Sequence, residues 1–168
     1  DSVRPTTDKV KESIFNIVQF EIEGRRVLDM FCGCGQLGIE ALSRGADSAV
    51  LIDGNVKAVE IIKKNARTTE LIGKCKIMRA DYSEYLKSAK NRGEKFDLIF
   101  LDPPYSKNFY KTALDLICQK KLLKDDGFVV LEWDSEIGFQ NEISDFELHK
   151  EKRYGRIGIT VLKWGLTQ

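Results

Sequence analysis

Short apolar runs alternate with amphipathic segments along most of the chain. Runs of this length that end at turn residues are typical of buried strands, and strands that alternate with helices predict a parallel sheet with helical crossovers. We predict five such strands, at residues 26–31, 49–53, 75–80, 96–101 and 128–133. The last of them, FVVLEW, is nearly continuous in apolar residues, so we expect it inside the sheet.

Helices are predicted where apolar residues recur three and four positions apart. The first is capped by Thr7 or Asp8, a long one by Asn55 and another by Asp81. A further helix is expected after a glycine-rich turn at residues 32–38. The predicted buried faces are Val10, Ile14, Ile17 and Val18; Val56, Val59, Ile62 and Ala66; Tyr82, Tyr85, Leu86 and Ala89; and Phe109, Ala113, Leu116 and Ile117.

The carboxyl-terminal part has a different pattern. Residues 146–153 and 157–164 predict two strands joined at Tyr154-Gly155-Arg156, which makes an antiparallel hairpin. Residues 135–144 are weakly patterned, and we expect a short helix with a loop there. Because the chain has no repeat, linker or low-complexity tract, we expect residues 1–168 to form one domain. The chain begins without a methionine, so we expect that residues are missing upstream.

Composition narrows the function only a little. The 168 residues are 42% hydrophobic and 32% charged, which suits one globular domain with a sizeable core. With 27 Lys and Arg against 26 Asp and Glu, the net charge of +1 means that any nucleic-acid binding must come from local patches. The cysteines lack metal-site spacing and His149 is the sole histidine, so we expect no metal site and reduced cytosolic thiols. No apolar run approaches the ~20 residues of a membrane span, and no signal peptide is visible.

The stretch FDLIFLDPPY, residues 96–105, carries the first candidate chemistry. Its strand must stop where Pro103 and Pro104 cannot donate ladder hydrogen bonds, at the sheet edge where open α/β sheets bind ligands. The Asp102 carboxylate and the Pro103 carbonyl can accept both hydrogens of an exocyclic amino group and turn its conjugated lone pair toward an electrophile. Tyr105 offers a flat face for a flipped-out base. The alternative is that Asp-Pro-Pro only terminates the strand.

A second candidate site lies at the turn after the first strand. Gly33, Gly35 and Gly38 fit the pattern G-x-G-x-x-G, and Asp53 ends the next strand at the offset of a ribose-binding acid. This indicates a nucleoside cofactor, with tight strand–helix packing alone as the alternative. Asp29, beside the turn, would repel a pyrophosphate but suits a cationic amino-acid group, so it favours S-adenosylmethionine over a nicotinamide dinucleotide.

Two further features each have two interpretations. Asp81 closes the third strand, where it can accept the adenine amino group of the cofactor or cap the following helix, and the two roles are compatible. The hairpin carries the densest basic cluster of the chain, which is a solvated surface by default and an RNA-facing edge as the functional alternative. Its members are His149, Lys150, Lys152, Arg153 and Arg156.

Taken in order, these motifs resemble the bacterial 16S rRNA guanine-N2 methyltransferase family over essentially the whole chain. The matching segments are RPTTDKVKE from Arg4, VLDMFCGCGQLGIEALSRGA from Val27, DLIFLDPPY from Asp97 and KRYGRIGI from Lys152. The resemblance implies the Rossmann-like class I methyltransferase fold, an α/β three-layer αβα domain with a mostly parallel seven-stranded sheet and a carboxyl-terminal antiparallel hairpin. It also implies S-adenosylmethionine as cofactor, S-adenosylhomocysteine as product, ribosomal RNA of the small subunit as partner, a monomeric state and a cytoplasmic location.

The resemblance also implies a role for each matching residue. The cofactor-binding residues are Asp29, Phe31, Gly33, Gly35, Asp53 and Asp81, and the catalytic residues are Asp102, Pro103, Pro104 and Tyr105. Three features depart from the family pattern. Asp53 stands where a longer Glu is commoner, Cys32 and Cys34 replace small residues, and the basic extension before Arg4 is absent.

Guanine is favoured by a local argument as well. Guanine has an N1–H donor beside its amino group, so an ionised Asp102 can accept from both, whereas adenine presents an acceptor there. Three rivals remain open at this point: an adenine-N6 methyltransferase of DNA or RNA with the same clamp, a nicotinamide dehydrogenase, and a non-catalytic RNA-binding domain.

Overall fold

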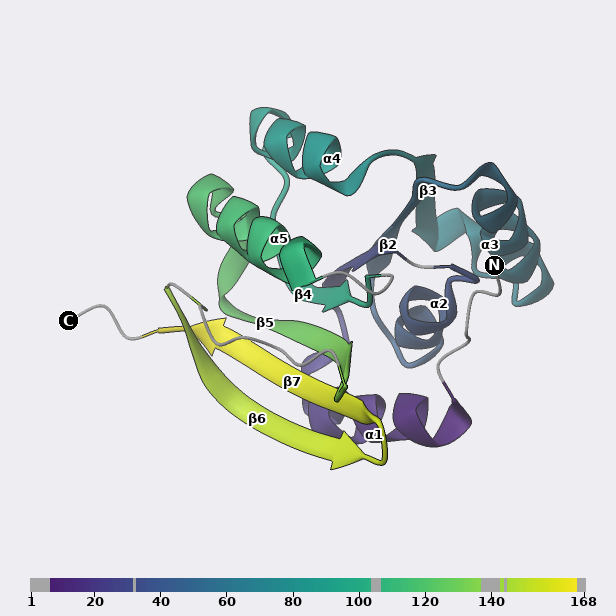
Figure 1. Ribbon diagram of the computed structural model, residues 1–168. Helices are drawn as coiled ribbons and strands as arrows, with labels where there is room; N and C mark the ends of the chain where they lie inside the picture. The colour runs from purple at the N-terminus through teal and green to yellow at the C-terminus, as the bar shows by residue number, and fades with distance from the viewer. Residues whose placement is uncertain (1–6, 32, 104–106, 137–142, 144, 166–168) are drawn as a thin grey trace.

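The computed structural model describes residues 7–31, 33–103, 107–136, 143 and 145–165. Within these residues seven strands form one sheet with helices on both faces (Figure 1). The helices are α1 (Asp8–Val18), α2 (Gln36–Ser43), α3 (Val56–Thr68), α4 (Tyr82–Ala89) and α5 (Lys107–Lys120). The strands are β1 (Arg26–Met30), β2 (Ser48–Asp53), β3 (Cys75–Arg79), β4 (Phe96–Leu101), β5 (Leu123–Asp134), β6 (Phe146–Tyr154) and β7 (Ile157–Trp164).

The strand order confirms the predicted mostly parallel sheet with a terminal hairpin. The order is β3-β2-β1-β4-β5-β7-β6, in which neighbours among β1 to β5 are parallel. Strand β7 runs antiparallel to both β5 and β6. As its apolar sequence predicts, β5 lies inside the sheet, between β4 and β7. The carboxyl ends of β1, β2, β4 and β5 therefore meet at one edge, which positions the candidate site.

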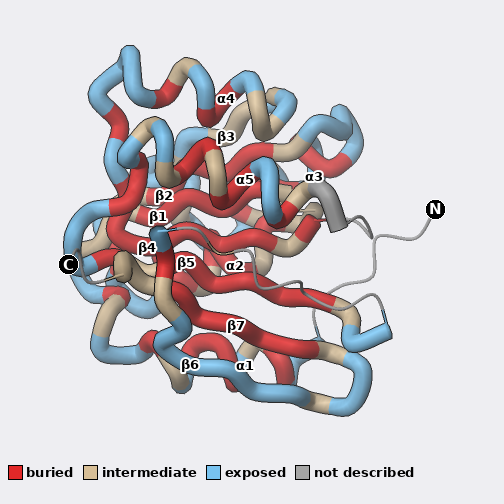
Figure 2. The backbone as a smooth tube through the Cα atoms, turned by 60° about the vertical axis from the view of Figure 1, so that its left-hand side comes forward, coloured by how far each residue is buried: buried red, intermediate tan, exposed pale blue. Residues whose placement is uncertain are grey.

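Two hydrophobic clusters, one on each face of the sheet, make the three layers. One cluster joins the sheet to α4 and α5, and the other joins it to α1, α2 and α3. Figure 2 shows the central strands buried and β6 exposed along most of its length. None of the helices in the described part of the chain is long and apolar enough to cross a membrane.

Helix starts follow the predicted capping residues. The Thr7 side chain accepts a hydrogen bond from the Val10 N–H, and the Asn55 side chain accepts from two backbone N–H groups of α3. Of the predicted buried residues, Ile17, Tyr82 and Phe109 are only partly buried and Val56 is exposed. Val56, which is 51% exposed, is the first residue of α3, and Ala58 lies on the buried face instead.

The predicted strand boundaries agree with the structure to within one residue, except at the start of β5. Strand β5 begins at Leu123, five residues early, since an irregular register lets it pass through the turn-like Asp125-Asp126-Gly127. A side chain at Gly127 would lie 2.8 Å from the Asp97 carbonyl oxygen, so only glycine fits there. Tyr154 belongs to β6, which leaves a two-residue turn with Gly155 at φ +58°. Most of the weakly patterned segment 135–144 lies outside the described residues.

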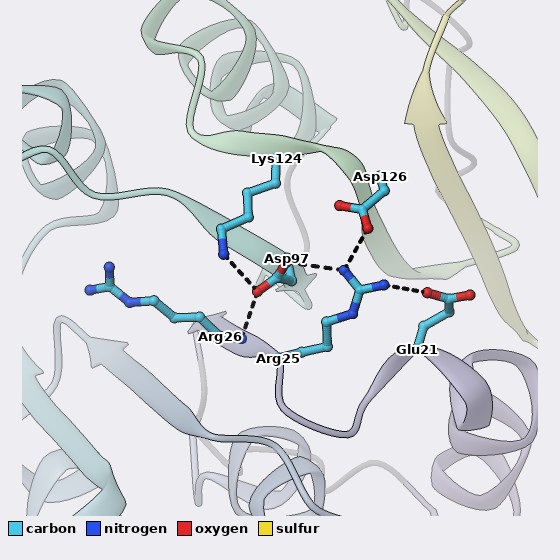
Figure 3. Close-up of polar contacts among 6 residues, drawn as sticks. All are labelled: Glu21, Arg25, Arg26, Asp97, Lys124 and Asp126. Carbon is cyan, nitrogen blue, oxygen red and sulfur yellow. Dashed lines mark hydrogen bonds and ion pairs between the residues drawn. The ribbon is translucent and has the colours of Figure 1, made fainter.

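A charged cluster closes the opposite edge of the sheet, at the amino ends of the strands (Figure 3). Asp97 is 7% exposed and accepts from Arg25 Nη1 at 3.1 Å, Lys124 Nζ at 3.2 Å and the Arg26 backbone N–H at 2.8 Å. Arg25 also pairs with Asp126 and Glu21. Burial opposes ionisation of Asp97, but these donors hold its pKa below the usual value. At this edge, a buried carboxylate is thus fully matched by cations.

Candidate active site

The carboxyl edge of the sheet gathers acidic side chains from four adjacent strands. Asp29 lies in β1, Asp53 ends β2, Asp102 follows β4 and Glu132 lies in β5. The register pairs Met30 with both Ile52 and Leu101, and Leu101 with Leu131, so these acids stand beside one another along the edge. Residues far apart in the sequence therefore form one acidic site.

The glycine-rich turn has the predicted strand–turn–helix form. Gly33 and Gly35 have φ of +55° and +78°, and Gly35 is the residue before α2. A side chain on Gly35 would also press on Ile62 at 3.2 Å. Gly38 serves packing, since a Cβ there would overlap Leu51 of β2. The turn can thus bring backbone close to a ligand while α2 stays tight against the sheet.

Asp29 is a buried carboxyl without a cationic partner among the described residues. Its side chain is 2% exposed, and Oδ2 accepts one hydrogen bond, from the Gly38 N–H at 2.9 Å. Burial raises the pKa of Asp29 to about 7, and the charge of Asp53 adds to this, while the bond from Gly38 lowers it by less. A ligand cation placed here would restore the carboxylate, whereas a phosphate would be repelled.

Asp53 links the glycine turn to the start of α3. Its Oδ2 accepts from the Gly33 N–H at 3.0 Å and its Oδ1 from the Asn55 N–H at 2.8 Å. Asn65 supports the same turn by donating from Nδ2 to the Cys34 carbonyl oxygen at 2.9 Å. Sequence reasoning missed Asn65 because it reads as part of the solvated side of α3, and no spacing rule marks it.

Asp81 has the capping role that the sequence offered as one of two. Its Oδ1 accepts from the Ser83 hydroxyl at 2.6 Å, the Ser83 N–H at 2.9 Å and the Glu84 N–H at 3.1 Å. These donors, the Ser83 hydroxyl foremost, lower the pKa of Asp81. Asp81 is therefore an ionised, oriented acid at the carboxyl end of β3, and contact with an adenine remains a prediction.

Three aromatic rings pack together beside these acids. Phe31, the residue after β1, has φ +59° and its ring lies 4.9 Å from Tyr82 and 5.3 Å from Phe109, with 5.3 Å between the latter two (centroid distances). Sequence reasoning named Phe31 as a cofactor-binding residue but assigned the other two to helix faces. Their positions at the starts of α4 and α5, where parallel strands end, are the signal that was available.

The acceptor side of the site is described in part. Asp102 is half-buried and Pro103 is buried, while Pro104 and Tyr105 lie outside the described residues. Burial raises the pKa of Asp102 well above its usual range, and the charges of Glu132 and Asp29 raise it further. The ionised Asp102 that the sequence predicts therefore needs a cationic neighbour in these surroundings.

Glu132 was not foreseen as a site residue. It is 8% exposed, and its backbone carbonyl accepts the Tyr110 hydroxyl at 2.5 Å. In sequence it is one polar residue within an apolar strand, and only the register with β4 brings it beside Asp102. Among the described residues, no group of three His, Cys, Asp or Glu side chains is arranged to hold a metal ion.

Comparison with known proteins identifies the family of the chain. Residues 1–163 match the family model described as Conserved hypothetical protein 95. The chain is 42% identical over 162 residues to the "Putative rRNA methyltransferase YlbH" of Bacillus subtilis, covering 96% of this chain and 88% of that one. It is 30% identical to the "Ribosomal RNA small subunit methyltransferase D" of Escherichia coli K12, covering 92% and 76%.

A solved structure confirms the fold. The "Putative methyltransferase yhhF" of Escherichia coli superposes with a TM-score of 0.87 at 27% identity, over 99% of this chain and 92% of that one. The predicted α/β Rossmann-like methyltransferase architecture is therefore correct. The family match and these relatives show that the chain belongs to the Conserved hypothetical protein 95 family, within the methyltransferase superfamily.

Proposed function

We propose that this chain is an S-adenosylmethionine-dependent methyltransferase that modifies the N2 amino group of a guanine in 16S ribosomal RNA. The observation that carries the proposal is the acidic carboxyl edge, where the buried Asp29 and the half-buried Asp102 have no cationic partner among the described residues. The names of the relatives supply the substrate class, since two of them are named as ribosomal RNA methyltransferases.

The residues present fit the cofactor by charge and shape. S-adenosylmethionine supplies an electrophilic methyl group on a sulfonium, and it carries an ammonium but no phosphate. Asp29 offers a desolvated carboxyl to the cationic amino-acid part, and the turn at Gly33 and Gly35 admits close approach of backbone. Phe31 offers an aromatic face, Asp53 a carboxylate to ribose hydroxyls and Asp81 an acceptor to the adenine amino group, and together they would hold the nucleoside.

Asp102 and Pro103 would orient the acceptor. Two hydrogens of the amino group bond to the carboxylate and to the prolyl carbonyl, which turns the nitrogen lone pair toward the methyl group. S-adenosylmethionine would supply the methyl group and leave as S-adenosylhomocysteine, and Asp102 or water would take the proton that the amino nitrogen gives up. A neighbouring cation favours the ionised carboxylate that this step needs. Tyr105 would stack on the extruded base, with Pro104 fixing the backbone before it.

The same proposal includes the setting of the enzyme. We propose that residues 1–168 act as one domain, because both hydrophobic clusters pack on the same sheet. We also propose the assembled small ribosomal subunit as substrate, a cytoplasmic location and a monomeric enzyme. Size-exclusion chromatography with light scattering tests the monomeric state directly.

Asp102→Ala tests the assigned chemistry. We expect turnover on unmethylated small ribosomal subunits to be lost, with the affinity for S-adenosylhomocysteine changed less than threefold, because the carboxyl acts on the acceptor. Asp47→Ala, an exposed acid at the opposite edge, is the matched control and should retain full activity. Mass spectrometry of the product nucleoside identifies the methylated atom. Substantial activity of Asp102→Ala, or methylation of adenine N6, would refute the corresponding part of the proposal.

A further inference from the structure

Strand β6 presents an exposed edge of the sheet and is separated from β5 of the candidate site by β7 alone. It is the last strand in the sheet order, so one side of its backbone faces outward. Lys150, Lys152 and Arg153 are exposed and follow one another closely along this strand, and we call these three residues the β6 cation strip. In Figure 2 this strand is exposed over most of its length, unlike the buried strands beside it.

The register places the β6 cation strip level with the acceptor residues. Leu101 of β4 pairs with Leu131, Leu131 with Thr160, and Thr160 with Glu151 of β6. The residues that follow Leu101 and Glu151 are Asp102 and Lys152 respectively, so these two end the same row across the sheet. Three interstrand spacings of about 4.8 Å separate them, which is about 14 Å. A nucleotide strand that enters the site can span this distance within a few nucleotides.

The charges of the strip are only partly balanced within the protein. Lys150 and Lys152 form no ion pair with any described residue, whereas Lys163 on the neighbouring strand pairs with Glu147 at 3.0 Å. Arg153 lies over the Trp133 ring, with its guanidinium carbon 5.1 Å from the ring centroid, and has one acidic contact, Glu151 at 3.6 Å. Two lysines are therefore available to an anionic partner.

The strip is held firmly relative to the site. The Ser13 hydroxyl of α1 donates to the Tyr154 hydroxyl at the end of β6. Trp133 Nε1 donates to Thr160 Oγ1 at 2.9 Å, and its ring covers Gly158, where any side chain would overlap it. Both ties lie near the hairpin turn, at the same edge as the acids. These contacts fix the backbone of the strip before a partner binds.

We propose that the β6 cation strip binds the phosphate backbone of the ribosomal RNA strand that flanks the target nucleotide. This inference rests on the proposed function. Lysines along an edge strand attract phosphates without reading sequence, so the strip supplies affinity and register while the acidic site recognises the base. Lysines on an edge strand also deter pairing with the sheets of other molecules. The salt dependence of RNA binding separates the two roles, because only lysines that contact RNA change it.

The test compares Lys150→Ala/Lys152→Ala with a matched control, Lys64→Ala/Lys74→Ala. The control removes two exposed lysines that have no ion pair with described residues and lie near β3, at the other end of the sheet. Binding of an unmodified 16S rRNA transcript is measured by filter retention between 50 and 200 mM KCl. Methylation of small subunits reconstituted from that transcript, and calorimetric binding of S-adenosylhomocysteine, are measured for all three proteins.

We expect the strip variant to flatten the plot of log K against log salt by about 1.5, since two phosphate contacts are lost. Its KM for subunits should rise about tenfold at low salt, with kcat and S-adenosylhomocysteine affinity within twofold of wild type. An equal loss in the control, or an unchanged salt slope in the strip variant, would overturn the inference while wild-type methylation still supports the proposed function. Wild-type protein that binds S-adenosylhomocysteine but neither binds nor methylates ribosomal RNA would overturn both.

Discussion

Asp29→Asn should stabilise the protein at pH 8 while it abolishes cofactor binding. The asparagine has nearly the same shape and keeps an oxygen for the Gly38 N–H, which donates to Asp29 Oδ2 at 2.9 Å. It removes a charge that is 2% exposed and faces no cation among the described residues. If Asp29→Asn stabilises the fold and abolishes cofactor binding, Asp29 serves binding at the expense of stability.

The structure gives the size and sign of the effect. Burial raises the pKa of Asp29 from 3.8 to about 7 in the folded state. The contribution of Asp29 to the free energy of unfolding is therefore fully present below the pKa of the unfolded state, where the carboxyl is neutral. It is lost as the pH rises through the pKa of the folded state. At 1.36 kcal/mol per pKa unit, the penalty reaches about 4 kcal/mol at pH 8, of which about 2.5 kcal/mol develops between pH 5 and pH 8. For a chain of this length that is a difference in Tm of about 5–10 °C.

Thermal unfolding of wild type, Asp29→Asn and the exposed control Asp47→Asn between pH 5 and pH 8 measures the effect. The Tm advantage of Asp29→Asn over wild type should widen as pH rises, while the control follows wild type. Calorimetric titration with S-adenosylhomocysteine should show an affinity of wild type that increases from pH 6 to pH 8, with proton release, because the ligand ammonium favours the carboxylate. A parallel pH dependence of Tm in Asp29→Asn and wild type would refute the reasoning.

Three further substitutions have effects that the packing determines. Gly38→Ala should lower the free energy of unfolding in urea by about 1–3 kcal/mol and weaken S-adenosylhomocysteine binding, because its Cβ would overlap β2. The control is Gly73→Ala, where a Cβ would have nothing within 4 Å, and it should change stability by less than about 0.5 kcal/mol. Gly158→Ala should cost at least as much as Gly38→Ala, because its Cβ would overlap the Trp133 ring, and loss of the native tryptophan fluorescence reports it. Asp97→Asn should cost about 2–3 kcal/mol at pH 7, and the difference should vanish as pH falls through the lowered pKa of Asp97, as urea titrations in acid would show.

The fold was largely predictable because its signals are local. Apolar runs, capping residues and turn glycines lie within a few positions of one another, and tertiary packing agreed with them at every strand except the start of β5. The start of β5 and the exposure of Val56 are errors that arose where tertiary structure overrode a local signal. An Asp-Asp-Gly turn pattern is absorbed into β5 because Phe96 pairs with Leu123 beyond it, and Val56 fits the helical period but is the first residue of its helix.

The candidate site was predictable only where a single segment carries it. Asp29, Gly35 and Asp102 stand at ends of apolar runs, which the sequence displays directly. Glu132 and Asn65 reach the site through strand register and helix packing, and these are properties of pairs of segments that no spacing within one segment encodes. The raised pKa values could not be predicted for the same reason, because burial is known only once the layers are assembled.

The two edges of the sheet differ in how their buried carboxylates are balanced, and this contrast separates the acids that stabilise the fold from the acids of the candidate site. At the amino edge, Asp97 is matched by Arg25 and Lys124, so its charge stabilises the fold (Figure 3). At the carboxyl edge, Asp29 is buried and Asp102 is half-buried, both without such partners among the described residues, so their charges oppose folding. A cationic ligand that binds there offsets this cost, and the stabilisation grows with the logarithm of the ligand concentration relative to its Kd. Under the proposed function, S-adenosylmethionine would therefore complete the electrostatics of the fold as well as donate the methyl group, and its binding should raise Tm most at the pH values where these carboxyls are charged.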